Sequence, residues 1–148
     1  MLAYKETVLL VDDEPEDLMK MRQALENDGY RVLDAADFGQ ALSVAKQNRK
    51  KIDILVTDIS LPGPNGCELA KYLLQSQPDL KLLFVSGHCG AEICRYYGIP
   101  VGGKHFMRKP ISLTEFVIRI RELLDSEERF QLSTDSGAEP TIQQSTGT

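Results

Sequence analysis

The sequence contains few cysteines and histidines and no tryptophan. Its three cysteines are odd in number and form no C-x-x-C pair, so the pattern gives no sign of a disulfide framework. We see no secretory signal peptide, and reduced thiols in the cytoplasm are therefore expected. No apolar run approaches the length that a membrane-spanning helix needs, so we expect no such helix.

Positive charge is also scarce, because 17 lysines and arginines stand against 22 aspartates and glutamates, for a net charge of -5. This balance argues against broad nucleic-acid binding, which usually needs a basic face. The chain of 148 residues with 42% hydrophobic residues is long and apolar enough for one globular domain with its own core, and too short for two comfortable ones.

Apolar runs that suit strands alternate along the chain with amphipathic segments that suit helices, which is typical of a parallel α/β sheet. We expect strands at 7–11, 31–35, 52–57, 81–85 and 105–108. Helices are expected at 14–28, 38–47, 67–77, 91–97 and 113–126, and the turn residues at 61–66 should not be helical. We place the domain at 1–126 and expect 127–148 to be a polar, disordered tail, since it has too few apolar residues to become ordered alone.

Polar residues stand where four of these runs end. They are Asp12 and Asp13 after the first strand, Asp58 after the third, Ser86 after the fourth and Lys109 after the last. In an open parallel sheet, ligands bind beyond the carboxyl ends of the strands, near the point where the strand order reverses. If these strands are neighbours, the five side chains converge on one small site.

Such a site suits phosphoryl chemistry. Three like charges in a crevice repel one another unless a cation is bound, and an all-oxygen site with open positions suits Mg²⁺. Lys109 and Ser86 are good partners for phosphoryl oxygens, and a carboxylate such as Asp58 can act as a nucleophile. Each feature alone is more simply explained as a helix cap, an acidic first turn or a loop. Only their joint occurrence favours a functional site.

With these motifs, residues 7–126 resemble the receiver domain of two-component response regulators. The resemblance rests on Val11-Asp12-Asp13-Glu14, on Asp58 followed by Pro62 and Gly66, on Ser86-Gly87 and on Lys109-Pro110. It implies a doubly wound, flavodoxin-like α/β fold with a five-stranded parallel sheet of order 2-1-3-4-5. This order agrees with the alternation of strands and helices.

The resemblance also implies a role for each metal and phosphoryl ligand. Asp58 matches the phosphorylated aspartate, and it also contacts the metal. Asp13 matches the direct metal ligand, Asp12 the carboxylate that holds the metal through water, and the backbone carbonyl of Ser60 the third protein ligand. The implied metal is Mg²⁺, with Mn²⁺ as a substitute. Lys109 matches the lysine that contacts the phosphoryl group.

Three further residues match the family: Pro110 at a cis peptide bond, and Ser86 and Phe106 at the conformational switch. The bond between Lys109 and Pro110 is expected to be cis. Phosphorylation would draw Ser86 inward, and the aromatic ring of Phe106 would fill the space that it leaves. The phenylalanine ring needs no hydrogen-bond partner in its inward position. We expect Phe106→Tyr to retain phosphorylation-dependent change, and loss of this change in the variant would contradict the mechanism. The alternative is that Phe106 is a plain core residue.

The function implied is a signalling switch that catalyses only its own phosphorylation and slow dephosphorylation, and is otherwise not an enzyme. Its expected partners are a histidine kinase or histidine phosphotransfer protein and a downstream protein, with no nucleic acid and no membrane. A short fourth helix followed by the Gly-rich segment 98–103 resembles the receivers of hybrid histidine kinases. His88 would influence the access of water or of a partner to the phosphoryl group; the alternative is a solvated loop histidine. Cys89 and Cys94 could approach each other, but free thiols are the default expectation.

Two other classes of function remain open at this point. A haloacid-dehalogenase-like phosphatase would use Asp58 as a turnover nucleophile, but such enzymes carry a second aspartate two residues later, where this chain has Ser60. A binding module that has lost phosphorylation would not need the acidic residues and Lys109 together. A relay intermediate and an output switch are not separated by the sequence.

Overall fold

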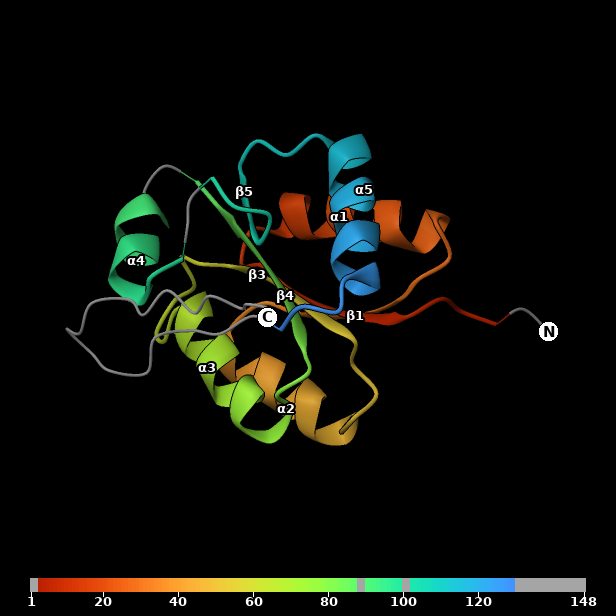
Figure 1. Cartoon of the computed structure of the whole chain (residues 1–148), viewed down its shortest axis with the longest axis horizontal. Coiled ribbons are helices and arrows are strands. Elements are labelled where there is room, and N and C mark those ends of the chain that lie inside the picture. The colour runs from red at the N-terminus through yellow and green to blue at the C-terminus, as the bar shows by residue number, and fades with distance from the viewer. Residues whose placement is uncertain (1–2, 88–89, 100–101, 130–148) are drawn as a thin grey trace.

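The computed structural model describes residues 3–87, 90–99 and 102–129. In this part of the chain, five parallel strands form one sheet in the order β2-β1-β3-β4-β5 (Figure 1), so the predicted doubly wound fold is confirmed. The strands are β1 (Thr7–Val11), β2 (Arg31–Ala35), β3 (Ile54–Asp58), β4 (Lys81–Ser86) and β5 (Phe106–Arg108). The helices are α1 (Pro15–Asn27), α2 (Phe38–Gln47), α3 (Gly66–Ser76), α4 (Gly90–Tyr97) and α5 (Leu113–Asp125).

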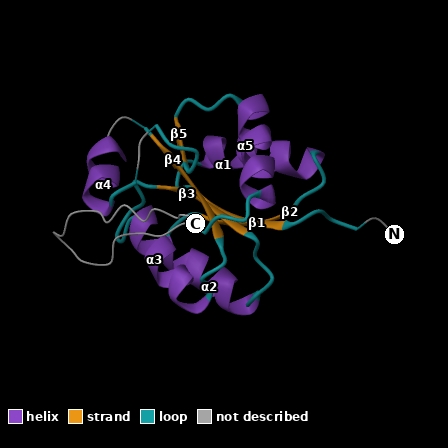
Figure 2. Cartoon of the chain, viewed as in Figure 1, coloured by secondary structure: helices purple, strands orange, loops and turns teal. Residues whose placement is uncertain are grey.

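Helices cover both faces of the sheet, and the core is therefore divided into two layers (Figure 2). On one face, strand residues such as Leu9, Leu55 and Phe84 pack against α2, α3 and α4. On the other face, alternate residues such as Leu10 and Val56 pack against α1 and α5. Because β1 and β3 are buried on both faces, they appear in the sequence as unbroken apolar runs rather than as alternating patterns.

Several element boundaries differ from those predicted, and the differences matter at the site. β3 begins at Ile54 instead of residue 52 and includes Asp58 as its last residue. β4 likewise includes Ser86. α3 begins at Gly66, one residue earlier than expected, because the side chain of Asn65 caps the helix and accepts a hydrogen bond of 3.0 Å from the amide of Glu68.

The turn after β3 folds back closely against the strand that it leaves. The Gly66 amide donates a hydrogen bond of 2.9 Å to the carbonyl of Ile59. A Cβ atom at Gly66 would lie only 2.2 Å from the carbonyl oxygen of Asp58, so no other residue fits this position without a shift of the backbone. The start of α3 is therefore set directly against the end of the strand that carries Asp58.

The chain beyond α5 stays attached to the rest of the molecule as far as the structure describes it. The Lys81 ammonium donates to the carbonyls of Ser126 and Glu128, and Arg129 forms an ion pair with Asp79. Within the described ranges, no helix combines the length and the apolar character that crossing a membrane requires. His88, Cys89 and the greater part of the predicted tail lie outside the described residues.

Candidate functional site

The carboxyl ends of β1 and β3 place three carboxylates together. In the register of these strands Val11 lies beside Thr57, which brings the next residues, Asp12 and Asp58, to the same edge of the sheet. Carboxylate oxygens of Asp12, Asp13 and Asp58 all lie within 4.8 Å of one another. Asp12 and Asp58 are buried and Asp13 is exposed, so the cluster opens to solvent on one side only.

Lys109 reaches this cluster from the end of β5. Its ammonium nitrogen lies 2.8 Å from Oδ2 of Asp12 and 3.0 Å from Oδ2 of Asp58. The backbone fixes the origin of the side chain, because the Lys109 amide donates a hydrogen bond of 2.8 Å to the carbonyl of Ser86 and so continues the β4–β5 pairing. The bond between Lys109 and Pro110 is cis, the isomer that the resemblance implies.

A fourth carboxylate belongs to the site and was not singled out from the sequence. Oδ2 of Asp17, in the first turn of α1, lies 3.1 Å from the Lys109 ammonium nitrogen. In the sequence, Asp17 looks like an ordinary acidic residue that favours a helix N-terminus. Its one distinguishing signal is that α1 begins directly after the acidic motif, which brings its first turn close to Asp12.

The second oxygens of the two buried carboxylates are held by backbone amides. Oδ1 of Asp12 accepts a hydrogen bond of 2.9 Å from the amide of Glu14. Oδ1 of Asp58 accepts one of 3.0 Å from the amide of Ser60. Each buried carboxylate is thus fixed between a backbone amide and the Lys109 ammonium.

The electrostatics of the cluster favour the binding of a cation. Burial raises the pKa of Asp12 to about 6, the negative charge of Asp58 adds to this rise, and hydrogen bonds from Lys109 and Glu14 oppose it. Burial by itself would lower the pKa of Lys109, but its hydrogen bonds to Asp12, Asp58 and Asp17 outweigh that effect and raise it. The Lys109 ammonium pairs with three carboxylates, and Asp13 adds a fourth negative charge to the cluster. A hard cation with oxygen ligands would reduce the remaining repulsion. The acidic triad is therefore able to hold a metal ion.

The two predicted switch residues lie on one face of the sheet. Phe106 pairs in register with Phe84, two residues before Ser86, and alternate residues of a strand point to the same face. Ser86 is fully buried and its hydroxyl donates a hydrogen bond of 3.1 Å to the carbonyl of Gly87. The ring of Phe106 is buried in the cluster that contains Cys94 and Tyr97. The switching roles of Ser86 and Phe106, and the role of the Ser60 carbonyl, stay predictions.

Comparisons with known proteins agree with this site. The family model of the response regulator receiver domain matches residues 8–121. The sensor kinase CckA of Brucella abortus (strain 2308) is 34% identical over 128 residues, which are 86% of this chain and 13% of that protein. The probable transcriptional regulatory protein TcrX of Mycobacterium tuberculosis (strain ATCC 25618 / H37Rv) is 34% identical over 137 residues, 92% of this chain and 56% of that protein.

A solved structure agrees as well. The non-phosphorylated HemR receiver domain from Leptospira biflexa is 30% identical, has a TM-score of 0.71, and the match covers 86% of this chain and 100% of that one. Since these relatives include a sensor kinase and a transcriptional regulator, the expected likeness to hybrid-kinase receivers stays a prediction. The family model alone covers well over half of the sequence. The chain therefore belongs to the response regulator receiver domains of two-component systems, and its acidic cluster is that of a phosphoaccepting signalling switch.

Proposed function

We propose that Asp58 is the phosphoaccepting residue and that it takes a phosphoryl group from the phosphohistidine of a histidine kinase or histidine phosphotransfer protein. The observation that carries this proposal is the position of Asp58 among the buried charges. It is the last residue of the central strand β3, its carboxylate is within 4.8 Å of the Asp12 and Asp13 oxygens, and it lies 3.0 Å from the Lys109 ammonium. The strand that ends in Asp58 lies between β1, which leads to Asp12 and Asp13, and β4, which ends in Ser86.

The metal in this proposal is Mg²⁺, and Mn²⁺ would fit the same ligands. We assign direct coordination to the exposed Asp13, coordination through water to the buried Asp12, and the remaining protein ligands to Asp58 and the carbonyl of Ser60. An all-oxygen set with open positions supports this choice, since Mg²⁺ retains several waters and commonly shares them with phosphate. When bound, the ion offsets the negative charge of the carboxylates and of the incoming phosphoryl oxygens.

In the transfer step, a carboxylate oxygen of Asp58 attacks the phosphorus atom of the donor. A phosphorus–oxygen bond to Asp58 forms, the phosphorus–nitrogen bond breaks, and its electron pair returns to the imidazole nitrogen of the donor histidine. We assign contact with the phosphoryl oxygens to Lys109, and the position of its ammonium between Asp12 and Asp58 supports this role. The amide of Ser60 holds the carboxylate in place throughout.

A hollow beside Lys109 supports a protein as the donor. It has a volume of about 440 Å³ and opens between α1 and the start of α5. Its lining is partly apolar and partly charged, and consists of Asp17, Lys20, Met21, Lys109, Pro110, Ile111, Leu113 and Thr114. Leu113 at the rim is 38% exposed. A donor histidine on a partner helix could approach the site across this surface.

For the output we propose that phosphorylation moves Ser86 toward the phosphoryl group and changes the packing of Phe106. The face that carries both residues is also the face covered by α4, so a downstream protein would sense the change there. We further propose residues 1–126 as the phosphoaccepting unit. We also propose a cytoplasmic location for this unit, which the free cysteines Cys67 and Cys94 support.

Binding of beryllofluoride, a mimic of the phosphoryl group, tests this assignment. We expect ¹⁹F NMR to show bound beryllofluoride for the wild type only when Mg²⁺ is present, and no bound signal for Asp58→Asn. The matched control is Asp28→Asn, which removes an exposed carboxylate paired with Lys5 and should bind as the wild type does. Binding that persists in Asp58→Asn, or that needs no divalent cation, would contradict the assignment.

A further inference from the structure

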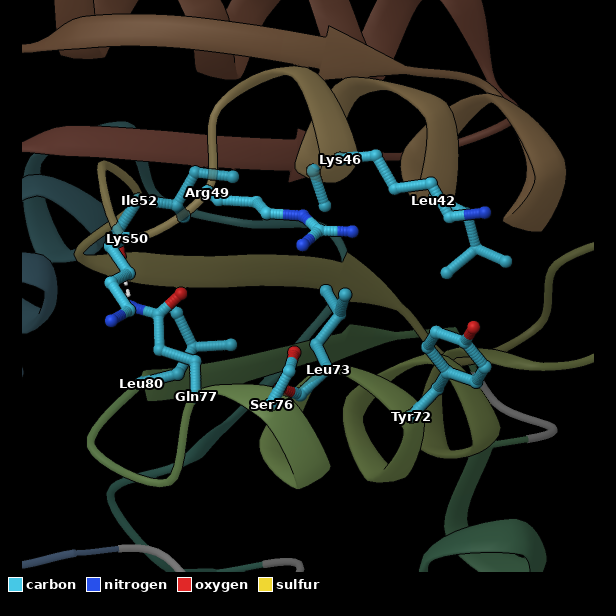
Figure 3. Close-up of a pocket in the computed structure, with 11 residues that line it drawn as sticks. Leu42, Lys46, Arg49, Lys50, Ile52, Tyr72, Leu73, Ser76, Gln77 and Leu80 are labelled. Carbon is cyan, nitrogen blue, oxygen red and sulfur yellow. Dashed lines mark hydrogen bonds between the residues drawn. The ribbon is translucent and has the colours of Figure 1, made fainter.

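A cavity of about 270 Å³ lies between α2 and α3, at the opposite end of the sheet from Asp58. Its position follows from Ile52 and Leu80, which line it and lie just before the starts of β3 and β4. Figure 3 shows side chains of the two helices facing each other across the opening. We call this the α2–α3 groove; it is lined by Leu42, Ala45, Lys46, Arg49, Lys50, Ile52, Tyr72, Leu73, Ser76, Gln77 and Leu80.

The groove combines an apolar interior with a basic rim. The leucines at 42, 73 and 80 contribute to the interior, whereas Lys46, Arg49 and Lys50 are exposed at the edge and no acidic residue takes part in the lining. In the part of the chain that the structure describes, none of these three cations has a carboxylate within ion-pair distance. In a chain of net charge -5, an unpaired basic rim around apolar side chains suits an acidic, partly apolar segment.

The chain itself leads toward this groove after α5. Glu128 forms an ion pair with Lys104, and its carbonyl accepts a hydrogen bond of 3.1 Å from Lys81. Arg129 then pairs with Asp79, with 2.9 Å between Nε and Oδ1. Asp79 is the immediate neighbour of Leu80, which lines the groove, and neighbouring Cα atoms are about 3.8 Å apart. Arg129, the last residue that the structure describes, is therefore held beside a residue that lines the groove.

The sequence that follows has the complementary chemistry. Residues 130–148 begin Phe130-Gln131-Leu132, carry the carboxylates of Asp135 and Glu139, and contain no lysine, arginine or histidine. We propose that this segment of the same chain occupies the α2–α3 groove, with Phe130 and Leu132 against the apolar interior and the two carboxylates against the basic rim. This inference is independent of the proposed phosphoryl chemistry.

Physical considerations favour an occupant from the same chain. The segment has too few apolar residues to become ordered alone, and the groove offers the apolar surface that it lacks. Because it is attached at Arg129, its effective concentration at the groove is of the order of millimolar, and even weak contacts would hold it. Part of the attraction is electrostatic between exposed groups, so it should weaken as salt is added.

Hydrogen exchange measured by mass spectrometry on the full chain tests the proposal. In the wild type at low salt, we expect the amides of residues 131–142 to exchange about 10-fold more slowly than in an unfolded peptide. The triple variant Lys46→Glu/Arg49→Glu/Lys50→Glu should lose this protection, and so should Asp135→Lys/Glu139→Lys. A variant that carries both sets of substitutions again has opposite charges on the groove and on the segment, and should regain the protection of residues 131–142. Arg95→Glu, a charge reversal at an exposed position on α4, is the matched control and should leave the protection of residues 131–142 unchanged.

Amide exchange in α1 and α5 should stay at the wild-type rate in every variant, and this result would show that the variants are folded. Unprotected exchange of residues 131–142 in the wild type would overturn the proposal. Protection that survives the triple variant would overturn it as well, because the segment would then lie elsewhere. Protection that disappears on dilution of the protein would show that the segment of a second copy fills the groove, and would overturn the assignment to the same chain.

Discussion

The backbone around Asp58 is packed so closely against Gly66 that this position admits no side chain. Gly66 lies against the Asp58 carbonyl so closely that a Cβ atom would be 2.2 Å from it. The amide of Gly66 also closes the turn by its hydrogen bond to the carbonyl of Ile59. The spacing of Gly66 from Asp58 is visible in the sequence, but its physical reason, the close approach of α3 to the strand end, is visible only in the structure.

We expect Gly66→Ala to lower the free energy of unfolding by about 2 kcal/mol, because the backbone near Asp58 must shift to admit the methyl group. Urea denaturation measures this loss. Gly39→Ala is the matched control, since the new Cβ would meet its nearest atom, Oδ1 of Asp37, at an ordinary 3.6 Å. Equal effects of the two substitutions would contradict the close-contact argument.

Asp12 makes the stability of the metal-free protein depend on pH. Its pKa in the folded state is raised to about 6 by burial and by Asp58, so the folded protein binds more protons than the unfolded one below that pH. The contribution of Asp12 is therefore fully present in acid and is lost as the pH rises toward 6 and above. Other carboxylates act in the opposite direction, as the lowered pKa of Glu6 beside Arg121 shows.

The comparison with Asp12→Asn isolates this effect. Between pH 4 and pH 7 we expect the free energy of unfolding of the wild type to fall relative to that of Asp12→Asn, by the order of 2 kcal/mol. Urea denaturation in the presence of a chelator at several pH values measures the difference. A difference that stays constant over this range would show that the pKa of Asp12 is the same in the folded and unfolded states, and one that grows in favour of the wild type would show that folding lowers it; either result would contradict the prediction.

At the scale of single elements, the helices α3 and α4 and the contact between them show what the sequence could and could not predict. The alternation of apolar runs predicted α4 and all five strands because buried strands and amphipathic helices have distinct periods. The start of α3 was missed by one residue because Asn65 caps it, which turn composition alone does not reveal. The hydrogen bond from the Tyr97 hydroxyl to Glu68 joins residues from separate helices, and no local pattern indicates it.

We expect this hydrogen bond to hold the C-terminal end of α4 against α3. Tyr97→Phe removes it and should speed amide exchange in α4 by about 5-fold, equivalent to about 1 kcal/mol, while α1 and α5 keep their wild-type rates. Tyr72→Phe deletes the hydroxyl of a half-exposed tyrosine on α3 and serves as the matched control. A uniform change across all helices, or none in α4, would contradict a local role.

At the scale of the whole molecule, the two ends of the sheet have different chemistry. The carboxyl ends of the strands gather the acidic cluster and Lys109, whereas the opposite end carries the α2–α3 groove with its basic rim. The first arrangement was predictable, because polar residues that end neighbouring parallel strands must meet at one edge. The contact of Asp17 with Lys109 and the α2–α3 groove were not predictable, because both depend on how helices pack over the sheet rather than on any strand end.

Phosphoryl transfer from a small-molecule donor tests the central claim most directly. The full chain is incubated with phosphoramidate and Mg²⁺, and the product is analysed by intact mass and by mapping of the modified peptide. We predict the addition of one phosphoryl group, located on Asp58, which is abolished by Asp58→Ala and by chelation of the metal. Absence of modification in the wild type, modification at another residue, or equal modification of Asp58→Ala would contradict the account.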